Sequence, residues 1–163
     1  MADAPANLTT RLLRDIRMLL GLSPSTWLDL LHAIFELGIA RYRLGAQPPK
    51  HLLQRARQLG QPTTMPPREA SAIAARVAFA IPRVAARLPW RADCFIQAMA
   101  AQRWLQSKGI PSALMIGTRK DEEGGFQAHA WLTCDDKIIT GGDISGYVPI
   151  VTPETPLPPA SRS

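Results

Sequence analysis

Two residues in the C-terminal half of the chain, Cys94 and His129, have the types and the settings for thiol chemistry. Cys94 directly follows Asp93, a residue type that commonly caps helices, so we expect Cys94 to be the first helical residue. The first turn of a helix presents unpaired N–H groups and the positive end of the helix dipole, which favour a thiolate and can hold an oxyanion. His129 lies in "QAHAWLTC", a pattern typical of a strand, and a strand packed on that helix could bring an imidazole base to the sulfur.

Residue types alone leave other interpretations open. A cysteine at a helix start is commonly a small buried hydrophobic residue, and a histidine in a strand is commonly a hydrogen-bonded packing residue. Cys94, His129 and Cys134 could also bind zinc, but their spacing matches no common pair of zinc ligands. A cysteine-based site would further need a third polar group to orient the imidazole.

The hydrophobic periodicity predicts the elements that would position these residues. Residues 94–108 are apolar on nearly every side, which predicts a buried helix that ends at Gly109. Residues 112–119 and 127–134 read as strands joined by an exposed turn, "KDEEGG", and residues 138–142 as a third strand. A buried helix followed by three strands indicates an α+β fold.

The N-terminal half predicts helices. We expect them over residues 8–21, from an N-cap at Ser25 to Gly45, over 51–60 and over 68–81, with Pro67 in the first turn of the last and Pro82 kinking or ending it. We therefore divide the chain into a helical N-terminal region (1–66), a core (67–151) and a proline-rich flexible tail (152–163).

Composition narrows the class of protein. The chain has 163 residues, 46% of them hydrophobic, which is enough for one packed domain. The longest apolar run, residues 26–40, carries Asp29, His32 and Glu36 and is too short to span a bilayer. Charged residues interrupt the first leucines, so no secretory signal is predicted. Two cysteines are too few for a disulfide framework, and we expect a reducing, cytoplasmic setting.

The net charge of +6 raises the question of an acidic partner. The arginines, however, are scattered along the predicted helices and form no basic cluster. This distribution favours solvated helix faces over nucleic-acid binding, and we expect neither a nucleic acid nor a membrane as a partner.

The segment from "LPWRADCFIQAMAAQRWLQSKGIPSALMIGTRK" through "GFQAHAWLTCDDKIITGGD" resembles the transglutaminase-like cysteine proteases of lasso-peptide biosynthesis. The resemblance covers roughly residues 85–150 and is carried by Cys94 at its helix start, by "KGIPSALMIG" and by "AHAW". It implies a papain-like or transglutaminase-like core, in which a buried helix bearing the nucleophile packs on a small antiparallel sheet.

The resemblance also implies a Cys–His–Asp site, with Cys94 as the nucleophile and His129 as the base. The acid would follow the histidine strand, and Asp143 is the first carboxylate in "KIITGGD". If Asp135 and Asp136 form a two-residue turn, simple pairing sets His129 opposite Gly142, which leaves Asp143 on the other side of the sheet. A bulge at Gly141–Gly142 would turn Asp143 back towards His129.

As a function, the resemblance implies a peptidase that removes the leader from a ribosomally synthesised lasso-peptide precursor. Its partners would be the precursor peptide, a separate protein that recognises the leader, and the lasso cyclase; no metal or other cofactor is expected. Two alternatives stay open: acyl transfer by the same three residues, and a non-catalytic scaffold that binds a peptide.

Two tryptophans flank the predicted site. Trp131 shares a strand face with His129 and is expected in the core. Trp90 lies shortly before Cys94 and is expected to pack, with an indole N–H that binds the oxyanion as the alternative.

Overall fold

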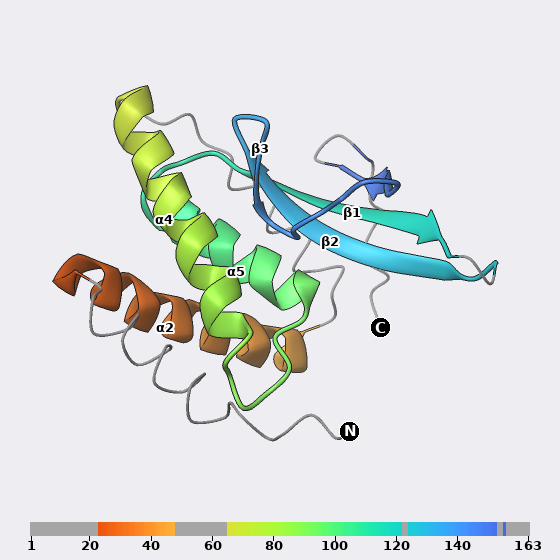
Figure 1. The fold of residues 1–163 in the computed structure, drawn as a ribbon, viewed down its shortest axis with the longest axis horizontal. Coiled ribbons are helices and arrows are strands. Elements are labelled where there is room, and N and C mark those ends of the chain that lie inside the picture. The colour runs from red at the N-terminus through yellow and green to blue at the C-terminus, as the bar shows by residue number, and fades with distance from the viewer. Residues whose placement is uncertain (1–22, 48–64, 122–123, 153–154, 156–163) are drawn as a thin grey trace, which may run out of the picture.

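A computed structural model describes residues 23–47, 65–121, 124–152 and 155. These residues form three helices and four strands (Figure 1): α2 (Pro24–Ala46), α4 (Pro67–Ala85), α5 (Cys94–Ser107), β1 (Ala113–Lys120), β2 (Phe126–Cys134), β3 (Lys137–Thr140) and β4 (Val148–Val151). The strands make one antiparallel sheet in the order β3-β2-β1-β4. The expected α+β fold is confirmed. The helices predicted over 8–21 and 51–60, and nearly all of the tail, lie outside the described residues.

The starts of the helices follow local capping chemistry. The side chain of Ser23 accepts the N–H of Thr26 at 3.3 Å, and Pro24 is the first residue of α2. The predicted cap at Ser25 was therefore wrong by two residues, because Pro24 has no N–H to lose and its fixed φ suits the first helical position. Pro82 does not end α4, which continues to Ala85.

One hydrophobic core joins the helices to the sheet. In Figure 1 the three helices lie together beside the strands, and α5 packs against α2, α4, β2 and β3. Fully buried residues of this core come from all three helices and from the sheet: Leu37 of α2, Val77 and Ile81 of α4, Leu105 of α5 and Leu132 of β2. Because α2 shares this core, the first predicted region packs directly on the second; the boundary at residue 66 stays a prediction.

Two carboxylates of α2 are buried in this core and paired with arginines. Asp29 accepts both Nε and Nη2 of Arg76 from α4, and Glu36 accepts Nε of Arg103 from α5 at 2.6 Å. Asp29 is 7% exposed and Glu36 is 2% exposed, so each carboxylate depends on its arginine partner to compensate the cost of burial. Among the described residues, no helix has both the length and the hydropathy to cross a membrane.

The Arg103–Glu36 pair predicts a measurable loss of stability on truncation. We expect Arg103→Met to lower the free energy of unfolding by about 3 kcal/mol, because Glu36 would stay buried without its main partner. Urea unfolding measures this as a lower midpoint with an unchanged slope. Arg87→Met is the matched control, since the exposed side chain of Arg87 donates to the carbonyl of Arg83 one turn away and pairs with no carboxylate in the described part of the chain. Equal midpoints for the two variants would contradict the prediction.

The turn between β2 and β3 is the predicted two-residue turn. Asp135 and Asp136 have φ angles of 46° and 61°, as a tight hairpin turn requires. The register then shifts: Thr133 pairs with Ile138, but Leu132 pairs with Thr140. The bulge thus falls at residue 139, not at Gly141–Gly142, where a bulge would have turned Asp143 back, and β3 ends before both glycines. Gly141 and Gly142 therefore have no strand pairing to keep, and the chain turns away from the sheet there.

The fourth strand, β4, was not predicted from the sequence. β4 pairs with β1 at the edge of the sheet, through Gly117↔Pro149 and Thr118↔Val148. β4 contains Pro149, and a proline cannot donate a hydrogen bond to a central ladder. An edge strand tolerates it, since one side of the strand needs no partner.

Candidate active site

Cys94 opens α5, as predicted. The side chain of Asp93 caps the helix by accepting the N–H of Ile96 at 3.3 Å, and the Asp93 carbonyl accepts the N–H of Gln97 at 3.0 Å. The N–H groups of Cys94 and Phe95 come before that first bonded turn, and such groups point out of a helix start towards any anion placed there. The thiol therefore lies beside two donors that suit an oxyanion.

Cys94 lies on the side of α5 away from α2. Cys94 lies on one helical stripe with Ala98, Ala101 and Leu105, all three of which are fully buried. The opposite side of α5 faces α2, which Arg103 contacts. Cys94 itself is half-buried, so the sulfur is at the accessible end of a buried stripe.

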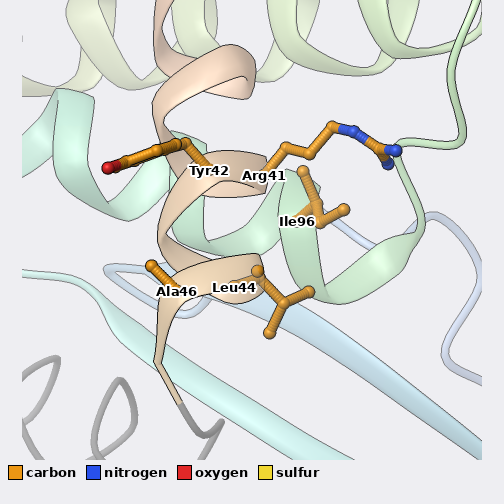
Figure 2. Close-up of a pocket in the computed structure, with 6 residues that line it drawn as sticks. Arg41, Tyr42, Leu44, Ala46 and Ile96 are labelled. Carbon is orange, nitrogen blue, oxygen red and sulfur yellow. The ribbon is translucent and has the colours of Figure 1, made fainter.

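A pocket of about 530 Å³ lies on the other side of this helix start, between α2 and α5 (Figure 2). Ile96 lines it together with Arg41, Tyr42, Leu44, Gly45 and Ala46. Residues two positions apart in a helix differ by about 200° in direction, so Ile96 points away from the side that carries Cys94. Arg41 donates to the carbonyl of Arg91 at 3.1 Å and so ties α2 to the segment before the nucleophile. The pocket is therefore separate from the thiol.

His129 of β2 has a defined proton arrangement. Its Nε2 lies 2.7 Å from the carbonyl oxygen of Gly141. A carbonyl only accepts, so Nε2 must carry the proton, and in the neutral ring Nδ1 then holds the lone pair. This is the state that a general base needs: one nitrogen is fixed by an acceptor and the other is free to take a proton.

Two aromatic rings lie beside this imidazole. The ring centroids of His129 and Tyr147 are 5.0 Å apart, and those of His129 and Trp131 are 6.2 Å apart. Trp131 is 2% exposed, which confirms that it is buried. Its ring lies over Gly117, the residue opposite His129 on β1, where any side chain would collide with it.

The structure does not join Cys94 to His129. Leu132 and Cys134 belong to the core that the helices cover, and alternation along β2 places His129 and Trp131 on the other face. Among the described residues, no hydrogen bond links the thiol to the imidazole, although α5 packs on β2. Their pairing stays a prediction, as do their roles.

Asp143 lies two residues after the carbonyl that His129 bonds, but its own carboxylate turns elsewhere. It is exposed, and its Oδ1 accepts the backbone N–H of Ser145 at 2.9 Å. The hydroxyl and the N–H of Ser145 hold the pKa of this carboxyl below its ordinary value, and Arg119 acts in the same direction. In this structure the group that orients His129 is the Gly141 carbonyl; Asp143 as the third member of the site stays a prediction.

Gly141 is a site residue that the sequence analysis considered only as a place for a bulge. Its φ is +110°, and a Cβ added there would lie 2.4 Å from Cβ of Trp131 and 3.3 Å from Nε2 of His129. Only glycine lets the backbone come this close to Trp131 and to the imidazole of His129. The signal in the sequence was the Gly-Gly pair after a strand, but the carbonyl contact depends on where the bulge falls.

Gly141→Ala should therefore disturb the base. We expect kcat for the proposed reaction to fall by about 100-fold, because the new methyl group pushes the carbonyl away from the imidazole. Gly142→Ala is the matched control: its φ is also positive, at +63°, but nothing lies within 4 Å of the added Cβ. Steady-state kinetics of both variants tests this. A similar loss in both would assign the effect to backbone strain alone.

Trp90 and Cys134 complete the predicted set. The indole N–H of Trp90 is buried and has no hydrogen-bond partner within the described part of the chain, so both its packing role and its oxyanion role stay predictions. Cys134 is 5% exposed, and burial raises the pKa of its thiol, helped by the negative charge of Asp135. The described residues contain no group of three or more His, Cys, Asp or Glu side chains that could hold a metal ion.

The two free cysteines should differ in reactivity. We expect iodoacetamide at neutral pH to modify Cys94 at least about tenfold faster than Cys134, because the thiolate reacts and burial suppresses it at Cys134. Peptide mapping by mass spectrometry over time gives both rates in one sample. The fast phase should vanish in Cys94→Ala and persist in Cys134→Ala. Equal rates would contradict an activated Cys94.

These features define a class: an α+β domain in which a cysteine opens a helix packed on the strand that carries a histidine. A family model for the transglutaminase-like superfamily matches residues 36–152, well over half of the chain, and the chain belongs to this superfamily. The superfamily is generally one of cysteine proteases and acyltransferases. No curated protein and no solved structure matches the chain.

Proposed function

We propose that the protein is a cysteine peptidase that removes the leader from a ribosomally synthesised lasso-peptide precursor. The observation that carries the chemistry is Cys94 at the start of α5, in a transglutaminase-like domain whose neighbouring strand holds His129 with Nδ1 as its basic nitrogen. The precursor as substrate rests on the sequence resemblance of residues 85–150.

In the proposed reaction, Nδ1 of His129 takes the proton of the Cys94 thiol, and the thiolate attacks the last carbonyl of the leader. The N–H groups at the start of α5 stabilise the oxyanion. The imidazolium then protonates the leaving amine as the peptide bond breaks, which leaves a thioester on Cys94. Water, deprotonated by His129, hydrolyses the thioester and frees the leader acid.

This sequence of steps requires the thiol and the imidazole to meet. In the free protein they are not hydrogen-bonded, and His129 lies on the face of β2 away from the helix-covered core, so their meeting needs a rearrangement larger than the tightening of a hydrogen bond. The proposal therefore places part of the assembly of the site in substrate binding. A separate leader-recognition protein that delivers the leader fits this requirement, and the lasso cyclase would use the freed core amine.

Purified protein incubated with the precursor peptide, with and without the leader-recognition protein, tests the proposal. Free leader acid and free core amine, seen by mass spectrometry, support hydrolysis. The superfamily also contains acyltransferases, so an added amine should be included; an amide between the leader and that amine would favour acyl transfer instead. Tight binding of the peptide without any cleavage would favour a non-catalytic scaffold.

A further inference from the structure

We propose that Tyr147 is a positioning residue that holds the imidazole of His129 with Nε2 on the Gly141 carbonyl and Nδ1 free for proton transfer. This inference rests on the proposed function. The ring centroids of the two residues are 5.0 Å apart, with their planes 38° from parallel. Tyr147 comes from the segment between β3 and β4, which the sequence analysis assigned no role.

The Tyr147 ring is itself fastened at two points. Its hydroxyl donates to Oε1 of Gln127 at 2.8 Å, and the same oxygen accepts Nη2 of Arg119 at 2.9 Å. The guanidinium of Arg119 also lies over the Tyr147 ring, 4.7 Å from its centroid, in a cation–π contact. The ring is therefore held by its polar end and by its face, and it can act as a rigid wall.

The backbone supplies this arrangement. Gln127 precedes His129 by two residues on the same face of β2, and Arg119 pairs with Gln127 across the β1–β2 ladder. Gly146 has a φ of +78°, and a Cβ placed on it would lie 3.2 Å from Cδ of Arg119. Glycine therefore lets the loop run close to the side chain of Arg119. The loop is thus tied to the sheet just before Tyr147.

The wall acts on the orientation of the base. His129 is half-buried, and a rotation of its ring about χ2 would break the bond to Gly141 and exchange the positions of Nδ1 and a carbon atom. Tyr147 occupies space beside that ring, and Trp131 lies on another side of it. Removal of the Tyr147 ring opens the space for the rotation, although no atom of Tyr147 has to touch the substrate.

Tyr147→Leu, Tyr147→Phe and Tyr42→Leu form the test series. Tyr42 is the other tyrosine of the chain and is 76% exposed, on the far side of α5 from the thiol. We expect Tyr147→Leu to lower kcat for the precursor peptide by about 10- to 100-fold with little change in KM. Tyr147→Phe keeps the ring and should stay within about threefold of the wild type, as should Tyr42→Leu.

Nitrogen-15 NMR of the histidine side chains provides the second readout, in the free protein. The wild type should show one protonated and one bare nitrogen for His129, whose signals the His129→Gln variant identifies. In Tyr147→Leu the two signals should move towards each other as the orientation and the proton placement mix. If Tyr147→Leu does not fold, Tyr147→Met also removes the ring and takes the same two measurements.

The outcomes separate the two proposals. An unchanged His129 spectrum together with unchanged kcat in Tyr147→Leu overturns the positioning role. A mixed spectrum in that variant supports it even if the wild type cleaves no peptide, a result that would overturn only the proposed function. A loss of kcat with an unchanged His129 spectrum would show that Tyr147 acts on something other than the imidazole, and so would also overturn the inference.

Discussion

Cys94→Ala protein should release no detectable leader from the precursor peptide, with a loss of about 10⁴-fold or more in kcat/KM. Without the sulfur no thioester can form, and the donors at the start of α5 can only bind the carbonyl. The fold should persist, because alanine is a strong helix former and Cys94 contributes a half-buried side chain at a helix end. Circular dichroism and the urea midpoint check the fold, and product analysis by mass spectrometry checks the activity.

Cys134→Ala is the matched control for this loss. It removes the chain's other cysteine, which lies in the core between the sheet and the helices, so it should cost stability while kcat stays near that of the wild type. A peptide that ends in an electrophilic ketone should label the wild type and Cys134→Ala once each, and Cys94→Ala not at all. Cleavage by Cys94→Ala at the wild-type rate would remove the nucleophile from the proposal.

The fold could be read from the sequence where local rules decide the outcome. The Asp93 cap, the buried helix after it, the left-handed Gly109 at its end and the Asp135–Asp136 turn all depend on neighbours in the chain. The edge strand β4 could not be predicted in this way. No neighbouring residue indicates that Pro149 lies at the edge of a sheet, where the missing N–H donor is harmless.

In the candidate site, local rules predicted the elements that carry the residues but not the contacts between them. Helix and strand patterns placed Cys94 and His129 on the correct elements, but the partner of the imidazole depends on a single residue of register. The bulge at residue 139 ends β3 early and brings the Gly141 carbonyl to Nε2, while Asp143 turns to Ser145. Tyr147 reaches His129 from a loop, and a loop without periodicity carries no signal of where it crosses the sheet.

Replacement of His129 by alanine tests the pairing that the whole proposal needs. We expect kcat/KM for the precursor peptide to fall by about 10³-fold, since both the base for the thiol and the acid for the leaving amine are lost. His32→Asn is a control histidine: His32 bonds Glu36 and its ring packs against Trp104 at a tilt, so its loss affects stability while the rate persists. Asp143→Asn separates the two candidates for orienting the imidazole. A loss as large as that of His129→Ala would assign the role to the carboxylate, whereas the contacts in the structure favour near-normal activity through the Gly141 carbonyl.

The rate of Cys94 alkylation in the His129→Ala protein is the sharper measurement, because it needs no knowledge of the substrate. If the imidazole reaches the sulfur, even in a minor population, its removal should slow the reaction with iodoacetamide by about tenfold at neutral pH, since less thiolate is present. An unchanged rate with the precursor peptide bound and without it would mean that the two side chains never meet. A reactive Cys94 would then owe its reactivity to the helix start alone, and the hydrolase proposal would fall, because a thiolate without a proton donor cannot expel an amine.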